Sequence, residues 1–223
     1  MEPLKTVRLW FEKTGRAKYI SHLDLVRCVT RALKRSGLPV WYTQGFNPHI
    51  YLTFALPLSL GQESCCEIMQ FRLVEEVEMQ EVARRLDVAL PEELRVRTAY
   101  DASEGRDFTK IAAARYQLRL QGDKKPLALA SALQKFVEQS AIITSKKTKK
   151  GIKEVDIRPM LLDAEVRAEK EACAATLRCA AGTQKNLNPA LLLDAFCTQT
   201  GCQLSVQRIF RDQLYDTEGA LFR

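Results

Sequence analysis

The stretch from Val7 to Ser36, VRLWFEKTGRAKYISHLDLVRCVTRALKRS, decides the fold class. Its first six residues alternate between a V/L/F set and an R/W/E set, a period of two that predicts a strand. Ser21 stands where a helix N-cap is expected, with Asp24 three residues later. Residues 22–36 then carry apolar side chains at helical spacing, and a glycine and a proline follow. The chain is therefore expected to open with a strand and an amphipathic helix.

The rest of the first half continues this alternation of strands and helices. Extended segments are expected over 40–43 and 50–56, a strand over 66–73, a helix over 77–90 and a strand over 94–100. The resulting order, β-α-β-β-α-β, is the ferredoxin-like arrangement.

Polar residues 102–110 predict a boundary between two domains, 1–104 and 111–223. The second half repeats the order of the first. Strands are expected over 116–120, 172–180 and 203–210, helices over 126–140 and from Asn188-Pro189, and extended segments over 141–144 and 152–165. We therefore expect an α+β fold of two tandem ferredoxin-like (βαββαβ) units, the second with an inserted basic hairpin.

Composition excludes several classes of protein. The longest uncharged apolar run, residues 51–60, is broken by Pro57, and about 20 such residues are needed to span a membrane. The first eight residues have no signal-peptide core, so a cytoplasmic location without a membrane partner is expected. The seven cysteines form no CxxC pair and there are only two histidines, so neither a metal site nor a cofactor is expected. Buried, reduced thiols are the expected state.

Charge is concentrated in two parts of the chain. Residues 1–36 carry nine Lys or Arg against three acids, residues 37–107 six against twelve, and residues 108–223 nineteen against twelve. The net charges of the three segments are +6, −6 and +7. Basicity focused in this way favours a polyanionic partner.

The first candidate for binding such a partner is the loop before the first helix together with the helix itself. Its basic residues are Lys13, Arg16 and Lys18 in the loop and Arg27, Arg31, Lys34 and Arg35 in the helix. The helical four follow i, i+4, i+7 and i+8, so they share one face away from the apolar residues. Such a surface would follow a phosphate backbone, although a solvated helix face, neutralised by nearby glutamates, is the alternative.

Two histidines could act in acid–base chemistry. The helical wheel places His22 among apolar residues, so its ring is expected to face the core or its edge. Alternatively, in the first helical turn it could bind a phosphate, or act as general acid–base on a ribose 2′-OH. His49 is the second candidate.

The second binding candidate surrounds one tight turn. It comprises Trp41, Tyr42, Phe46, Asn47 and His49. Aromatic stacking combined with amide hydrogen bonds is how proteins recognise unpaired RNA bases. The alternative is that the aromatic residues pack in the core and that Asn47-Pro48 only forms the turn.

The third candidate is a lysine-rich arm before an alternating segment. Its basic residues are Lys146, Lys147, Lys149, Lys150, Lys153 and Arg158. Lysine suits phosphate as a compact point charge. A mobile, solvated loop is the alternative to a protruding basic hairpin.

Six stretches carry a resemblance to a known family: Tyr19–Arg27 with its SHLD sequence, Arg31–Pro39, Gly45–His49 (GFNPH), Leu56–Ser64, Lys150–Arg158 and Asn188-Pro189. Together they resemble the bacterial radical-SAM-linked family, a domain of unknown function, over nearly the full length. Cys65-Cys66 stands where the family usually has Ser-Glu-like residues.

The resemblance implies a radical SAM partner, because members of the family lie beside or fused to such proteins. This chain lacks the CxxxCxxC iron–sulfur motif, so it would be the accessory. We therefore expect an RNA-binding accessory protein, without cofactor chemistry of its own, in RNA modification or in ribosome or RNA maturation.

Two other functions remain open. One is a metal-independent endoribonuclease or RNA-modifying enzyme that uses His22 or His49. The other is a protein-only adaptor for the radical SAM enzyme, with the acidic face at Glu75, Glu76, Glu78 and Glu81 as its contact.

Overall fold

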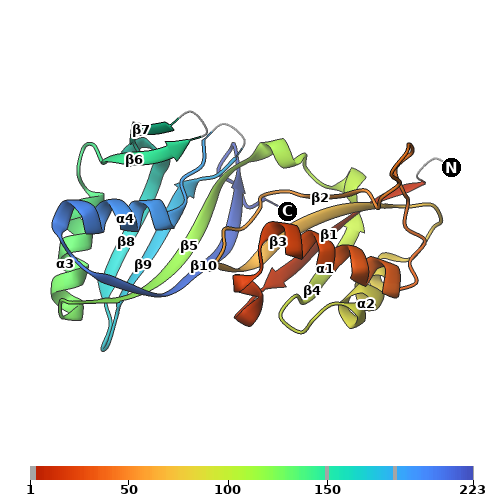
Figure 1. Ribbon diagram of the computed structural model, residues 1–223, viewed down its shortest axis with the longest axis horizontal. Coiled ribbons are helices and arrows are strands. Elements are labelled where there is room, and N and C mark those ends of the chain that lie inside the picture. The colour runs from red at the N-terminus through yellow and green to blue at the C-terminus, as the bar shows by residue number, and fades with distance from the viewer. Residues whose placement is uncertain (1–3, 149–150, 183–184, 223) are drawn as a thin grey trace. The chain divides into compact units, whose positions relative to one another are not determined.

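The computed structural model describes residues 4–148, 151–182 and 185–222 (Figure 1). The chain divides into two compact units, Met1–Lys110 with Phe222–Arg223, and Ile111–Leu221. Each unit combines α-helices with antiparallel strands, so the protein belongs to the α+β class. No helix in the described ranges is long and apolar enough to cross a membrane.

The first unit is built around four antiparallel strands. Its elements are β1 (Lys5–Lys13), α1 (His22–Arg35), β2 (Leu52–Phe54), β3 (Glu63–Leu73), α2 (Met79–Ala89) and β4 (Val96–Asp101). Short 3₁₀ turns follow β1 (η1, Gly15–Tyr19) and β4 (η2, Ala102–Glu104; η3, Phe108–Lys110). β1 pairs with β4 on one side and with β3 on the other, and β3 also pairs with β2.

The helix α1 begins at its Ser21 N-cap, as the sequence predicts, because the Ser21 hydroxyl accepts the backbone N–H of Asp24 at 3.1 Å. Its buried face carries Leu25, Val29 and Leu33, which join the core formed with β1 and β3. The opposite face of α1 is thereby left to solvent.

The second unit has the same succession of long strands and helices, with one insertion. Its elements are β5 (Ile111–Gly122), α3 (Pro126–Val137), β6 (Ile143–Thr148), β7 (Gly151–Asp156), η4 (Arg158–Met160), β8 (Leu161–Ala168), β9 (Cys173–Ala180), α4 (Pro189–Thr200) and β10 (Leu204–Asp216). β5 lies between β10 and β9, and β8 pairs with β9, all antiparallel. Phe136 of α3 and Phe196 of α4 meet edge to face, with ring centroids 5.4 Å apart.

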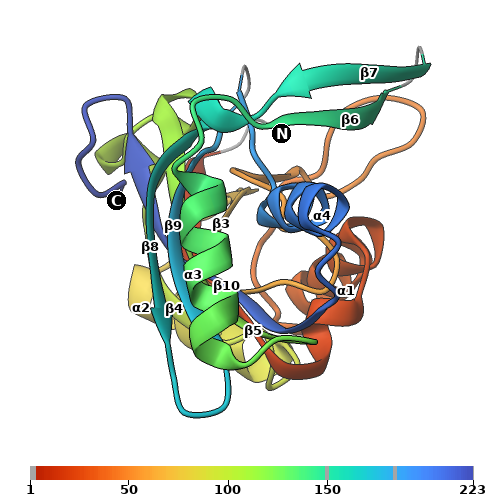
Figure 2. The same cartoon turned by 90° about the vertical axis from the view of Figure 1, so that its left-hand side faces the viewer.

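The insertion is the β6–β7 hairpin, a separate two-stranded sheet that extends from α3 and β8 (Figure 2). At its base the N–H of Ile157 donates to the carbonyl of Ile142 at 2.9 Å, and both side chains are buried. The carboxylate of Asp156 accepts the N–H groups of Ile142 and Arg158. The expectation of one extended arm over 152–165 is wrong, because η4, with Pro159, interrupts it after this base.

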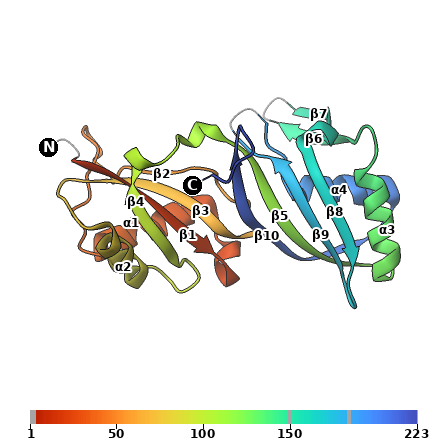
Figure 3. The ribbon, with the colours of Figure 1, turned by 180° about the vertical axis from the view of Figure 1, so that it is seen from behind.

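Each sheet has one face covered by α-helices and one without them (Figure 3). In β1 the residues that face the helices, Val7, Leu9 and Phe11, are completely buried. The alternate residues Arg8 and Trp10 therefore lie on the other face. We call this helix-free side the outer face of the sheet.

Candidate nucleic-acid interface

The basic residues predicted on α1 all reach solvent. Arg27, Arg31, Lys34 and Arg35 are exposed, on the side opposite the buried leucines and valine of the helix. A shallow depression of about 360 Å³ lies among Asp24, Arg27, Cys28, Arg31 and Arg35. We call Arg27, Arg31, Lys34 and Arg35 the α1 basic stripe.

Two members of the α1 basic stripe have partners within the unit. Arg27 pairs with Asp24 at 3.2 Å, and the hydroxyl of Ser21, followed by Arg27, lowers the pKa of the Asp24 carboxyl. Arg35 donates to the carbonyl of Ala89 at 2.7 Å. Arg31 and Lys34 make no hydrogen bond or ion pair with any residue that the structure describes. Their charges are therefore available to an anion.

The acids of α2 do not neutralise the stripe. Glu81 accepts from the Nε atoms of Arg84 and Arg85, each at 2.7 Å, and these hydrogen bonds lower the pKa of its carboxyl to about 2. Asp87 accepts the N–H of Val96 at 2.8 Å and pairs with Arg95 at 3.3 Å. Both acidic residues of α2 thus bind arginines of the same unit or the backbone of β4.

The Glu81 contacts predict a pH-dependent contribution to stability. The folded pKa, about 2, lies below the ordinary value of 4.5, so the contribution is complete above about 4.5 and is lost as the pH falls toward 2. Glu81→Gln should lower the urea midpoint near neutral pH, and the difference from the parent protein should shrink on acidification. Glu76→Gln, at an exposed position, serves as the control. If Glu81→Gln lowered the urea midpoint equally at neutral pH and near pH 2, the result would contradict this account.

The loop before α1 contributes less than expected. Lys13 is only 2% exposed, so its side chain cannot form part of a surface. Lys18 lies 3.9 Å from Glu63, whose carboxylate also accepts the N–H of Gly15 at 3.0 Å. Arg16 is exposed and pairs with Glu93 at 3.2 Å. The sequence pattern around the loop could not predict these partners, because Glu63 and Glu93 are distant from it in the chain.

The His22 side chain is exposed, and its ring makes an edge-to-face contact with Phe54 at 5.2 Å. Phe54 is partly buried against the core of the first unit, so the ring lies at the edge of the core and not inside it.

The GFNPH turn is an exposed loop closed at its base. Tyr42 and Ile50 form a bridge, and the N–H of Thr43 donates to the carbonyl of His49 at 2.8 Å. From Gln44 to His49 every residue is exposed, and Phe46 is fully so. An unburied phenylalanine at a loop tip has no packing role in this unit, which leaves its ring available to a partner.

His49 is oriented by the same loop. Its Nδ1 lies 3.1 Å from the carbonyl oxygen of Asn47 and 3.1 Å from the hydroxyl of Thr43. A carbonyl can only accept, so the Asn47 contact requires the proton on Nδ1 and leaves the lone pair on Nε2.

Trp41 and Tyr42 differ in position. Tyr42 is exposed, whereas Trp41 is half-buried beside Tyr51, with ring centroids 6.3 Å apart. The guanidinium of Arg72 lies 5.4 Å from the Trp41 ring and 4.2 Å from that of Tyr51. Trp41 therefore anchors the base of the loop.

The lysine arm is the β6–β7 hairpin. The register places Lys146 opposite Lys153, and Lys153 is exposed. Lys149 and Lys150 lie outside the described residues. Arg158 was expected to bind phosphate. It instead donates hydrogen bonds to the carbonyls of Gln139 and Leu161, which stabilise the base of the hairpin.

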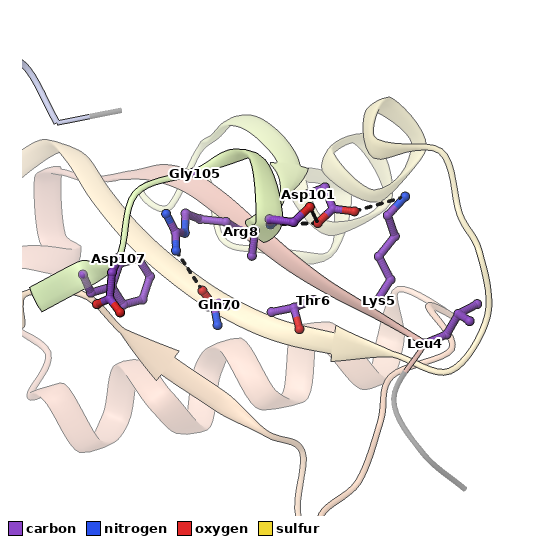
Figure 4. Close-up of a pocket in the computed structure, with 11 residues that line it drawn as sticks. Leu4, Lys5, Thr6, Arg8, Gln70, Asp101, Gly105 and Asp107 are labelled. Carbon is purple, nitrogen blue, oxygen red and sulfur yellow. Dashed lines mark hydrogen bonds and ion pairs between the residues drawn. The ribbon is translucent and has the colours of Figure 1, made fainter. Parts of the chain in front are cut away.

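The outer face of the first unit carries a depression that the sequence did not reveal (Figure 4). Its volume is about 640 Å³, and Lys5, Thr6, Arg8, Gln70 and Asp101 line it, together with residues 102–108. Arg8 is 4% exposed and donates to Gln70 at 3.2 Å and to the carbonyl of Arg106. Its guanidinium lies 4.4 Å from the Phe108 ring. Lys5 pairs with Asp101. The lining also holds Arg8 and Asp107, so its two positive and two negative charges balance.

The thiols show no sign of activation. Burial raises the pKa of Cys179 to about 12 and that of Cys173 to about 11. Burial also raises the pKa of Cys28, although Arg35 and Arg31 oppose the shift. No group of three metal-ligating side chains occurs within residues 4–148, 151–182 and 185–222.

Alkylation should follow this burial. In the folded protein at mildly alkaline pH, iodoacetamide is expected to leave Cys173 and Cys179 unmodified, because the thiolate is the reactive form. In guanidinium chloride both should react, as peptide mass spectrometry would show. Rapid labelling of either residue in the folded state would show that β9 opens locally.

These features define an α+β protein whose first unit presents a basic helix face, with Arg31 and Lys34 unpaired among the described residues, and an exposed aromatic loop. A family profile described as "Uncharacterized protein conserved in bacteria (DUF2344)" matches residues 6–189, and the chain belongs to this family. No curated protein matches the chain.

Two solved structures resemble the chain weakly. One, described as an unknown protein from Galdieria sulphuraria, is 13% identical over 91% of this chain and 96% of its own, with a TM-score of 0.29. The other, a putative glycine cleavage system transcriptional repressor, is 14% identical over 93% and 98%, with a TM-score of 0.25. Similarities this weak carry no argument about the fold or the function.

Proposed function

We propose that this chain is an RNA-binding accessory protein that presents RNA to a radical SAM partner. The α1 basic stripe and the lysine arm hold phosphates, and the exposed GFNPH loop contacts bases. The observation that carries the proposal is the pair Arg31 and Lys34, two exposed cations without an acidic partner among the described residues. Unpaired cations on a rigid helix favour a polyanion, because its binding releases condensed counterions.

The chemistry of the loop supports RNA over other polyanions. Phe46 offers a fully exposed aromatic face, and Asn47 offers an exposed amide next to it. Stacking on aromatic rings together with amide hydrogen bonds suits unpaired bases, which RNA loops supply.

The strand order supports the finer assignment of the fold that we propose. The orders β4-β1-β3-β2 and β10-β5-β9-β8, all antiparallel, each fit a ferredoxin-like unit. In the second unit the β6–β7 hairpin is the inserted basic element.

The radical SAM partner rests on the sequence resemblance at the SHLD and GFNPH stretches. This chain has no CxxxCxxC motif, so in our proposal the partner supplies the cluster chemistry and this chain holds the RNA.

Crosslinking and sequencing of RNA bound to the tagged protein in cells tests the proposal. A discrete RNA peak is expected, and it should be lost when Lys146, Lys147 and Lys153 are changed to glutamate. Absence of enrichment above background would overturn RNA binding. A complex with the radical SAM protein that survives high salt without RNA would then favour a protein adaptor.

His49 supports a second candidate, RNA cleavage or modification by the chain itself. Its Nε2 lone pair, fixed by the Asn47 contact, could accept a proton from a 2′-OH. RNA turnover by the purified protein, lost in His49→Ala or His22→Ala with unchanged thermal stability, would favour this function.

A further inference from the structure

The outer face of the second sheet carries an ordered array of polar side chains. Along β5 the residues Tyr116, Leu118 and Leu120 are buried toward the helices, so the alternate residues Gln117 and Arg119 lie on the outer face. The same alternation applies to β9, to residues 163–167 of β8 and to residues 208–212 of β10.

The strand register arranges these residues in two adjacent rows. The first row crosses the sheet as Arg208, Arg119, Ala174 and Arg167. The second row crosses it as Phe210, Gln117, Thr176 and Glu165. A row of arginines therefore lies beside a row that holds an aromatic ring, an amide, a hydroxyl and the carboxylate of Glu165.

A depression of about 410 Å³ lies over these rows. Ala174 and Thr176 of β9 are small, so the side chains on either side of them stand higher. The longer chains of Arg119, Arg167 and Arg208 line the same depression.

The arginine row has more positive than negative charge around it. Arg119 and Arg208 are directly opposite each other on paired strands. Glu169 serves two arginines, since it lies 2.8 Å from Arg119 and 3.6 Å from Arg167. The guanidinium of Arg208 lies 4.2 Å from the Phe210 ring.

We infer that this outer face is a binding platform for single-stranded RNA. Phosphates lie along Arg208, Arg119 and Arg167, and one base stacks on Phe210 within reach of Gln117 and Thr176. The inference deepens the proposed function, on which it rests, by adding a second surface and by specifying unpaired RNA. A four-stranded sheet with a half-buried aromatic ring among cations can bind splayed bases, whereas a duplex keeps its bases stacked inside.

Fluorescence anisotropy with a labelled 12-nucleotide single-stranded RNA tests the platform, and the same RNA annealed to its complement is the comparison. Phe210→Ala should weaken single-strand binding about 5- to 150-fold and leave duplex binding unchanged. Arg119→Glu with Arg208→Glu should flatten the slope of log K against log salt by about 1.4, the expectation for two lost phosphate contacts. Lys124→Glu with Lys135→Glu, at exposed positions in the same unit, matches the charge change and should bind as the parent protein does.

Glu169→Gln supplies a test of the opposite sign. Loss of this carboxylate frees Arg119 and Arg167, so single-strand affinity should rise. A purely structural ion pair would instead give unchanged or weaker binding.

The outcomes separate the platform from the proposed function. If the parent protein binds RNA and the Phe210 and arginine variants bind equally well, the platform is overturned and RNA binding stands. If the parent protein binds neither RNA at low salt, the proposed function fails and the platform fails with it.

Discussion

Arg31→Glu with Lys34→Glu should weaken RNA binding by about 10- to 100-fold at moderate salt, with the fold intact. Two attractive contacts, each worth about 1 kcal/mol at 4 Å in water, are lost, and together they correspond to about 30-fold in affinity. Both side chains are exposed and unpaired among the described residues, so no buried partner is orphaned by the change. Anisotropy titrations over a range of salt concentrations would measure the loss together with a flatter salt dependence.

The Lys124→Glu with Lys135→Glu variant separates a local contact from net charge. It changes the total charge by the same amount at sites outside the α1 basic stripe. Equal loss of binding in both double variants would show that only the overall charge matters. Unchanged binding in the Arg31/Lys34 variant would remove the stripe from the proposal.

Leu33→Ala should destabilise the first unit by about 2–5 kcal/mol. Leu33 has no exposed surface and joins the core beneath α1, so truncation leaves a cavity under the helix that carries the stripe. Both tryptophans, Trp10 and Trp41, lie in the first unit, so tryptophan fluorescence during urea unfolding reports on this unit.

Leu23→Ala is the matched control on the same helix. Leu23 is 58% exposed, and its truncation should change the free energy of unfolding by less than about 0.5 kcal/mol. Similar losses in the two variants would mean that α1 is not held by its buried face.

Local sequence patterns predicted much of the fold. The alternation in β1, the Ser21 cap of α1 and the Asn188-Pro189 start of α4 are set by residues close in the chain. The end of the hairpin could not be predicted from local patterns. The chain leaves the extended conformation at η4, directly after the hydrogen bond between Ile142 and Ile157 that closes the base of the hairpin.

Side-chain partners at the site could not be predicted in the same way. Exposure of the α1 basic stripe follows from helical periodicity. The burial of Lys13, the pairing of Lys18 with Glu63 and the structural use of Arg158 depend on segments brought together only by folding. The arginine row in the second unit was hidden for a related reason, because its members come from three strands and align only through register.

The closed base of the β6–β7 hairpin makes the arm a removable module. Because Ile142 and Ile157 are already hydrogen-bonded neighbours, a short glycine link could replace residues 143–155 without stretching the chain on either side, and Asp156 would keep its hydrogen bonds at the base. The buried side chains of both isoleucines would stay in the core. Another domain or a fluorescent reporter could be inserted at the same junction. Related proteins could likewise have a longer hairpin, or none, without a change in the rest of the second unit.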